Sequence, residues 1–402
     1  MKRKIALLLA MVLTLTTIQT NYALADEEKA VTTTAETTTE TVQPLQLSIE
    51  DAIKLAVEND RGMWKINDGI KQMQQMRKDK RDAKEIVESM MEKSLTDDFT
   101  SEEAYYRSDY ISALMDKNGY YIKTADTQEK LLEKKKEVLT AGIELGTKRI
   151  YYKVLIAEKT IEINKAKLAS ANEQLRVINL KFNTGSATKA DVLKGEMAVH
   201  QAQTELDSAN DDLNMSKLNL LNGLNLPFDT EVILTSKDLN YVPTQQLNLN
   251  AAIEKAKKDR TEIIEAENAL ELQKIETHVY KAYYTSNLRQ YKYAEEKLKD
   301  AELNVPQAYK DVELDVRTSY LNLVKAERSL VNMDKTVELA KEAARINKLL
   351  YANGMAAAAD VISADANLAE AEIGRYQVLV AYNLSKLMFD NSNLIGSTSA
   401  GN

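Results

Sequence analysis

Cysteine is absent from this 402-residue sequence, and proline and glycine are scarce, with four and twelve residues. Without cysteine the chain can form no disulfide and has no thiol chemistry, so packing alone must stabilise the fold. Proline and glycine interrupt or weaken helices, and their scarcity therefore predicts an all-α protein built from long helices.

Motifs that carry catalytic chemistry are also missing. The only histidines, His200 and His278, are too far apart in the sequence to match a metal-ligand spacing. The sequence contains no nucleophile elbow, no phosphate-binding glycine loop and no zinc pattern. We therefore expect a protein that is not an enzyme and that binds neither a cofactor nor a metal.

The charge balance argues against nucleic acid as a partner. The sequence has 53 basic and 61 acidic residues, 44% hydrophobic residues and a formal net charge of −8. Removal of a leader containing Lys2, Arg3 and Lys4 would leave 50 − 61 = −11. Binding to phosphate groups needs a concentrated basic face, which this acidic excess opposes.

Residues 1–25 have the pattern of a secretory signal peptide. The basic start is followed by an apolar stretch from Ile5 to Ile18, and Ala23-Leu24-Ala25 is a small-residue cleavage site. The alternative is an uncleaved anchor, but the stretch is shorter than the roughly 20 residues of a spanning helix. We expect export to the cell envelope or the extracellular space.

The remainder contains an internal duplication, which is the mark of a repeat architecture. The opening LQLSIEDAIKLAVEND, from Leu45 to Asp60, returns as LNLNAAIEKAKKDR, with Ser48 matched by Asn248 at an offset of 200. The segment KFNTGSATKADV, from Lys181 to Val192, returns as LYANGMAAAADV at an offset of 169. The first repeat therefore carries about 32 extra residues, which fall between Asp60 and Arg149.

These matches divide the chain into six segments. We expect a signal peptide at 1–25, a disordered threonine-rich linker at 26–44, a first helical repeat at 45–223, a connector at 224–246 with a short strand at 231–235, a second helical repeat at 247–390 and a disordered tail at 391–402.

Large apolar residues recur every seven positions in both repeats, which predicts antiparallel coiled-coil hairpins. A row of small residues, Gly195, Ala202, Ala209 and Ser216, runs beside this seam and would let helix backbones approach closely. The seam residues are Val154, Ile161, Leu168, Leu175, Val192, Val199, Leu206 and Leu213 in the first repeat and Leu323, Leu330, Val337, Val361 and Leu368 in the second.

The two quoted repeats together resemble the TolC family of bacterial outer-membrane efflux proteins over about residues 45–390. Each repeat has an aromatic residue, a glycine three positions later and an Asp-Val pair six positions after that glycine. The resemblance implies an elongated protomer of long helical hairpins, three of which form a hollow α-barrel. It also implies docking of a periplasmic-adaptor-type protein and an inner-membrane pump, driven by ATP (the ABC class) or by protons.

The resemblance places the adaptor-docking tips at the two glycine turns, with tip residues Phe182, Gly185, Asp191, Tyr351, Gly354 and Asp360. In the family a D-V-L-D pattern narrows the entrance of the tube. Asp360 matches its first carboxylate, whereas Ser363 stands at the second position, so Asp365 is the candidate substitute. Read from the residues alone, both glycines are simple helix-terminating residues and Asp191 is half of a capping box with Thr188. Asp360 has no such explanation, because Ala357 occupies the capping position.

One part of the sequence departs from the family. The family inserts a barrel hairpin into each repeat, and the matching segments here are about 75–125 and 283–312. Barrel strands alternate apolar and polar residues over about 9–11 positions, and these charged segments do not. We expect helices and turns there and no membrane barrel, which makes association with the outer membrane doubtful.

Tyrosines concentrate beside these two segments, and the simplest expectation is that they pack the far end of the helices. Because tyrosine combines an apolar ring with a polar tip, contact with cell-wall polymer is the alternative. They are Tyr105, Tyr106, Tyr110, Tyr120, Tyr121, Tyr280, Tyr283, Tyr284, Tyr291 and Tyr293.

The sequence as a whole predicts an exported, trimeric, all-α conduit component of an efflux complex. The competing hypothesis is a structural coiled-coil protein of the cell envelope that has lost transport.

Overall fold

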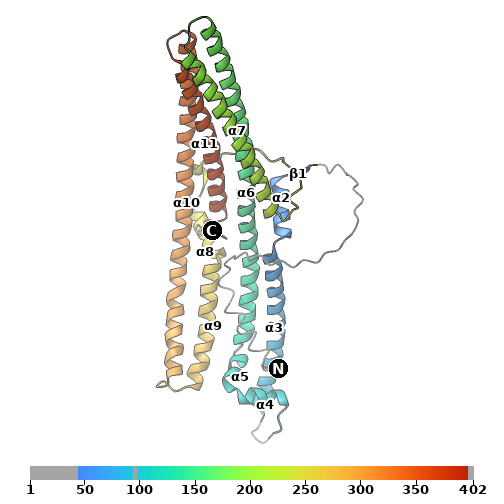
Figure 1. Cartoon of the computed structure of the whole chain (residues 1–402). Coiled ribbons are helices and arrows are strands. Elements are labelled where there is room, and N and C mark those ends of the chain that lie inside the picture. Colours follow the sequence, from blue (N-terminus) through green and yellow to red (C-terminus); the bar gives the residue numbers. More distant parts are fainter. Residues whose placement is uncertain (1–43, 94–96, 397–402) are drawn as a thin grey trace, which may run out of the picture. The chain divides into compact units, whose positions relative to one another are not determined.

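The computed structural model describes residues 44–93 and 97–396 and consists mainly of long helices (Figure 1). The predicted signal peptide, nearly all of the predicted linker and residues 397–402 lie outside the described residues. The first repeat contains β1 (Leu45–Leu47), α2 (Ile49–Glu58), α3 (Arg61–Glu92), α4 (Ser101–Ser108), α5 (Tyr110–Lys117), α6 (Tyr120–Asn183) and α7 (Lys189–Gly223). The rest contains β2 (Val232–Leu234), the 3-10 turn η1 (Thr244–Gln246), α8 (Leu249–Asp259), α9 (Thr261–Tyr283), α10 (Arg289–Ala352) and α11 (Ala358–Asp390).

The duplication is visible in the helices. α2 and α8 begin with equivalent caps, because the Ser48 side chain accepts a hydrogen bond from Asp51 N and the Asn248 side chain accepts one from Ala251 N, each at 3.0 Å. The long helices α6 and α10 both contain 64 residues, which corresponds to about 96 Å each. α10 continues through Pro306 without ending.

The extra length of the first repeat lies between the starts of α3 and α6. α3 and α9 begin at Arg61 and Thr261, which are 200 residues apart. α6 and α10 begin at Tyr120 and Arg289, which are 169 residues apart, so the offset between the repeats falls between these two points. α3 is longer than α9, and the added helices α4 and α5 pack against it around Val87. Apart from 94–96, both segments predicted to be helices and turns are helices and turns.

Near the glycine turns α7 packs against both α6 and α11, α6 packs against α11, and α10 packs against α11 (Figure 1). Beyond the middle of the long helices, α3 packs against α6, α6 against α9, and α9 against α10. Both repeats therefore contribute helices to one continuous layer.

Each repeat has its own hydrophobic core near the connector. Tyr151 is fully buried in the first, where its hydroxyl donates to Leu47 O at 3.0 Å and accepts from Ser236 N at 3.1 Å. Tyr382 is fully buried in the second, and its hydroxyl donates to Val242 O. The two tyrosines thus hold the connector at residues 236 and 242. The expected strand at 231–235 appears as β2, which pairs in parallel with β1.

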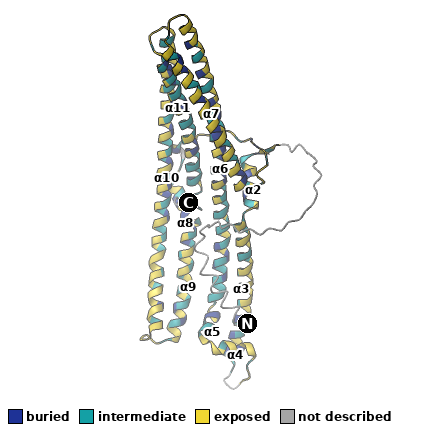
Figure 2. Ribbon diagram, viewed as in Figure 1, coloured by how far each residue is buried: buried dark blue, intermediate teal, exposed yellow. Residues whose placement is uncertain are grey.

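Buried positions are interspersed with exposed ones along the long helices (Figure 2). The seven-residue seam is buried to different degrees in the two repeats. In α10, Leu323, Leu330 and Val337 are all buried. In α6 the seam residues Val154 and Ile161 are buried, but nearer the tip the buried residues are Ala171 and Ile178 on a neighbouring row. The row changes because the small residues of α7 approach α6 closely there. Val192 and Val361 are buried, and the half-buried seam residues are Leu168, Leu175, Val199, Leu206, Leu213 and Leu368.

The expectation of a disordered tail from 391 onward is wrong for residues 391–396. Arg260, which is only 4% exposed, donates to Ser392 O at 3.1 Å, and Asn393 Nδ2 donates to Asp259 Oδ2 at 2.8 Å. Ile395 is also buried. The segment continues past α11 because α8 and α9 offer it specific polar partners.

Candidate functional site: the paired helix tips

The two glycine turns end α6 and α10 in the same way. Gly185 and Gly354 have φ angles of 76° and 74°, in the left-handed region that glycine adopts without strain. Ser186 N donates to Lys181 O at 2.7 Å and Met355 N donates to Leu350 O at 2.8 Å, as in a glycine-terminated helix. Nothing lies within 4 Å of a Cβ built on either glycine, so backbone conformation, rather than space, favours glycine.

The helices that follow the turns begin with different caps. In α7, Asp191 N donates to Thr188 Oγ1 at 3.2 Å and Asp191 Oδ2 accepts from Thr188 N at 2.9 Å, which is a complete capping box. Hydrogen bonds from the Thr188 hydroxyl and backbone lower the pKa of Asp191. In α11, Asp360 Oδ2 accepts from Ala357 N at 2.9 Å. The expectation that Asp360 has no capping role is therefore wrong, because the backbone half of the box needs no side chain at residue 357.

The structure brings the two tips together through Lys181 and Tyr351. Lys181 Nζ donates to Tyr351 O at 2.9 Å and lies 3.6 Å from the centre of the Tyr351 ring. Tyr351 packs on a small cluster of Ile178, Val192 and Ala358, and burial, followed by the charge of Asp191, raises its pKa. Phe182 is 41% exposed and is not among the residues of this cluster.

A second link between the repeats lies about two turns further along α11. Asp365 accepts hydrogen bonds from Ser170 Oγ at 2.6 Å and Gln174 Nε2 at 2.7 Å, both on α6. Lys348 Nζ on α10 lies 2.9 Å from the other carboxylate oxygen of Asp365. The Asp365 side chain is only 11% exposed, so this carboxylate is held between three helices.

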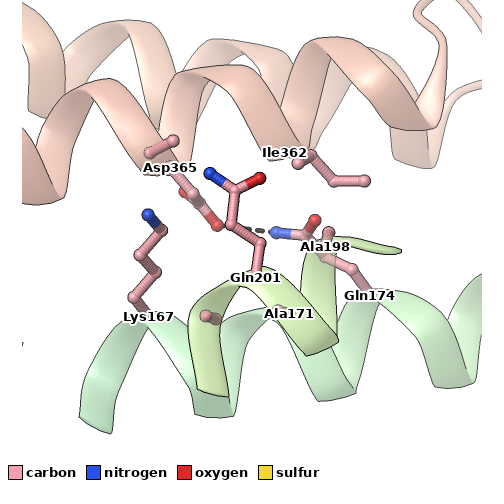
Figure 3. Close-up of a pocket in the computed structure, with 9 residues that line it drawn as sticks. Lys167, Ala171, Gln174, Ala198, Gln201, Ile362 and Asp365 are labelled. Atoms are coloured by element: carbon pink, nitrogen blue, oxygen red, sulfur yellow. Dashed lines mark hydrogen bonds between the residues drawn. The ribbon is translucent and has the colours of Figure 1, made fainter. Parts of the chain in front are cut away.

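A small cavity of about 50 Å³ lies beside this link (Figure 3). Its lining includes Lys167, Gln174, Gln201 and Asp365, and the figure shows the Gln174 amide directed at Asp365. Lys167 lies 2.5 Å from Glu205 Oε2 on α7. The cavity is therefore part of the polar contact among α6, α7 and α11.

The two candidate constriction residues lie in different surroundings. Asp360 is exposed and lines a groove of about 530 Å³ between α10 and α11, together with Asn347, Ser363 and Asn367. Asp365 faces α6 instead, because five residues along a helix correspond to a rotation of about 140°. The structure thus separates the two carboxylates onto different sides of α11.

Sequence reasoning placed the tip glycines and the caps but missed the links. Lys181, Ser170 and Gln174 carry no local signal, since each finds its partner 170 to 195 residues away in the chain. In the described part of the chain, no cluster of histidine or carboxylate side chains has a geometry that could hold a metal ion. No described helix is both long enough and apolar enough to cross a membrane.

This arrangement of two long-helix hairpins joined at paired tips is a TolC-like fold, the fold of outer-membrane efflux channels. Over 86% of this chain it matches a membrane protein from Pseudomonas aeruginosa, with a TM-score of 0.63, 12% identity and 93% of that chain covered. It matches the outer-membrane channel OprN with a TM-score of 0.63 and 12% identity, covering 87% of this chain and 90% of that one.

The open state of the MtrE outer-membrane channel from Neisseria gonorrhoeae matches with a TM-score of 0.55 and 14% identity, covering 94% of this chain and 98% of that one. No family model and no curated protein matches the sequence. Because identities are this low, the shared property is the fold. The similar proteins are channels rather than enzymes, and their place in the outer membrane is compatible with a cell-envelope protein.

The Lys181 link yields a prediction about the stability of the tips. Lys181→Met keeps most of the side-chain length but removes the ammonium group from Tyr351. We expect backbone amides at 353–357 to exchange hydrogen about fivefold faster, as loss of roughly 1 kcal/mol would cause. Hydrogen exchange measured by mass spectrometry checks this, with Lys189→Met, an exposed lysine in the first turn of α7, as the control. Equal exchange in both variants would show that the link does not stabilise the tips.

Proposed function

We propose that three copies of the chain assemble edge to edge into a ring of helices that encloses an export conduit. The single observation that carries this proposal is a stripe of exposed apolar side chains along each of two helices, α7 and α10. The fold shared with outer-membrane channels supports the same assembly.

The stripe on α10 is opposite the buried face of the same helix. Leu321 is 64% exposed, and its neighbours on the stripe are separated by intervals of seven, eleven or eighteen residues, which return to nearly the same face. The buried residues Leu323 and Leu330 lie about 160–180° away around the helix. We call this the α10 stripe, and it consists of Leu303, Leu314, Leu321, Leu339 and Ile346.

The stripe on α7 also lies away from the buried face of its helix. Met197 is 71% exposed and lies about 120–140° around the helix from the buried small residues Ala202 and Ala209. We call this the α7 stripe, and it consists of Leu193, Met197, Met215 and Leu218. Isolated exposed apolar residues are normal, but a stripe on each of two helices indicates a partner.

The two stripes are at matching distances from the tips. Leu193 lies roughly one turn into α7, which begins at Lys189, and Ile346 lies less than two turns before α10 ends at Ala352. Further from the tips, Leu218 at the far end of the α7 stripe and Leu321 within the α10 stripe each lie roughly eight turns from the tip end of their helix. An α7 helix of one copy can therefore pack antiparallel against α10 of the next with apolar residues level.

Contacts between two different surfaces close into a ring when the rotation per copy is suitable. A closed ring covers both stripes of every copy, whereas a single copy leaves both in water. The acidic, polar residues of the remaining helix faces would line a passive path for solutes. A partner pump, driven by ATP or by protons, would supply the energy through an adaptor protein docked on the tips at Gly185 and Gly354.

The second candidate is a structural coiled-coil protein of the envelope, favoured by the helical segments at 75–125 and 283–312. Electron microscopy of the chain expressed without residues 1–25, combined with its mass in solution, separates the two. A trimer with a central channel is expected. A monomer, or an assembly with a closed centre, would leave only the structural role.

The single tryptophan offers a direct signal of assembly. Trp64 is 70% exposed near the start of α3. Gly62 approaches Leu139 of α6 and Gly69 approaches Leu132, so Trp64 lies level with residue 137 of α6. Because α10 is the equivalent of α6 in the second repeat, residue 306 of α10 is expected at the same height. Leu303 of a neighbouring copy would then be close to its ring.

We expect tryptophan fluorescence to shift to shorter wavelength as protein concentration rises through the association range. Trp64 is the only emitter of its kind in the chain, so the shift can be followed without labelling. Leu303→Asn should reduce this shift, and the matched control Phe228→Ala, at an exposed connector residue, should not. An emission maximum independent of association would place α3 outside the interface.

A further inference from the structure

The end of the described helices that is opposite the tips is formed by α4, α5 and the turn between α9 and α10 (Figure 1). Several tyrosines contact one another there. α5 begins at Tyr110 and α9 ends at Tyr283, and the centres of their rings are 5.8 Å apart. The ring centre of Tyr284 lies 4.8 Å from that of Tyr283 and 5.6 Å from that of Tyr280. We call Tyr110, Tyr283, Tyr284 and Tyr280 the tyrosine row, which joins the two repeats.

The row holds its rings at fixed, mutually tilted angles. Tyr283 and Tyr284 meet edge to face at 84°, and Tyr110 is tilted by 43° from Tyr283. Such pairs stabilise each other beyond simple burial, so the rings need not be ordered by a ligand. Binding to this surface would therefore cost little side-chain entropy.

The row remains open to a partner. Tyr110 is 42% and Tyr283 is 48% exposed, and Tyr105 on α4 and Tyr293 on α10 are 53% and 54% exposed. Within the described residues none of the four row hydroxyls forms a hydrogen bond. Apolar ring faces and unused donor hydroxyls are thus presented together.

We propose that the tyrosine row binds a glycan of β-linked pyranose sugars, such as the amino-sugar strands of a cell wall. The apolar C–H face of a pyranose packs against an aromatic ring, while its equatorial hydroxyl and amide groups reach outward to hydrogen-bond donors and acceptors. Tyrosine meets both needs in one side chain. An extended series of rings suits a polymer, and the two cavities described above are elsewhere, near the tips.

The local charge distinguishes a glycan from an anionic membrane surface. Membrane-binding helices present lysine and arginine toward lipid headgroups. Beside the row, Glu102 and Asp109 are accompanied by Arg107 and Lys117 on α4 and α5 and by Lys281 on α9, whereas Glu103 is buried and bound to Lys93. The charge beside the row is therefore mixed rather than basic, which gives anionic lipid no concentrated attraction and leaves a neutral sugar face unaffected.

The test uses the chain without residues 1–25 and two sugar probes, a soluble β-1,4-linked N-acetylglucosamine oligomer and purified peptidoglycan sacculi. Binding is measured by calorimetry for the oligomer and by co-sedimentation for the sacculi. We expect Tyr110→Ala with Tyr283→Ala to weaken binding about tenfold or more. Tyr110→Phe with Tyr283→Phe keeps the ring faces and should lose much less.

The matched control is Phe228→Ala, an exposed aromatic residue in the connector, which should bind as the unchanged chain does. If the double alanine variant melts early, Tyr105→Ala with Tyr293→Ala tests the exposed flank instead. Vesicles of phosphatidylcholine and phosphatidylglycerol form the third arm. Absence of sugar binding, equal binding by the alanine variants, or binding to vesicles alone overturns the proposal. Mass in solution is recorded for every variant, so failure of ring assembly is scored separately.

Discussion

Leu339→Glu combined with Ile346→Glu is expected to convert the proposed trimer into monomers. Both residues lie on the α10 stripe beside the tips, at the level of Leu193 and Met197 on α7. Placing two carboxylates in an apolar contact costs about 3 kcal/mol or more at each interface, which weakens association over a hundredfold. Mass measured by light scattering across a concentration series checks this.

The control for this variant introduces the same charge on another side of the same helix. Val331 is exposed but lies about 80° from Leu321 around α10, outside the stripe. Val331→Glu should leave the mass unchanged. Circular dichroism should show the same helix content in all three proteins. Persistence of the trimer in the Leu339 and Ile346 variant would refute the edge-to-edge arrangement.

Tyr151→Ala should destabilise the first repeat by about 3–5 kcal/mol. The Tyr151 ring is fully buried among Leu47, Val154 and Leu220, so its removal leaves a large cavity. Its hydroxyl also joins β1 to residue 236 of the connector. Tyr151→Phe keeps the ring and should cost only about 1–3 kcal/mol, because Leu47 O and Ser236 N lose a partner.

Urea unfolding followed by circular dichroism measures both changes at constant protein concentration, since assembly also contributes to stability. Phe228→Ala, at an exposed ring of the same connector, should change stability by less than about 0.5 kcal/mol. If Tyr151→Phe costs as much as Tyr151→Ala, the hydroxyl rather than the packed ring controls the connector.

The helix boundaries were accessible from the sequence because they depend on neighbours within one turn. Ser48, Asn248 and Thr188 cap the helices that follow them, and Gly185 and Gly354 end the long helices in the left-handed conformation. Repetition of these signals in both halves of the chain showed two equivalent units. The cap formed by Asp360 was missed because the capping-box pattern requires a polar side chain at residue 357, which is alanine. Asp360 instead accepts a hydrogen bond from the backbone N–H of that residue.

The contacts between the repeats were not accessible in this way. The seven-residue rows indicated which residues could be buried, but the structure buries Ala171 and Ile178 in α6 where the sequence favoured Leu168 and Leu175. Each helix can rotate about its axis and keep an amphipathic face, so the close approach of Gly195 and Ala202 on α7 decides which row lies inside.

The sequence by itself determined an all-α chain of two repeats, its turns and its caps, because hydrogen bonds within a few residues and the scarcity of proline and glycine set these. Only the tertiary structure decided that Lys181 meets Tyr351, that Asp365 meets Gln174 and that the tyrosine row joins α5 to α9. Such contacts join residues far apart in the chain, and their formation depends on the relative height and rotation of packed helices, which no local pattern encodes.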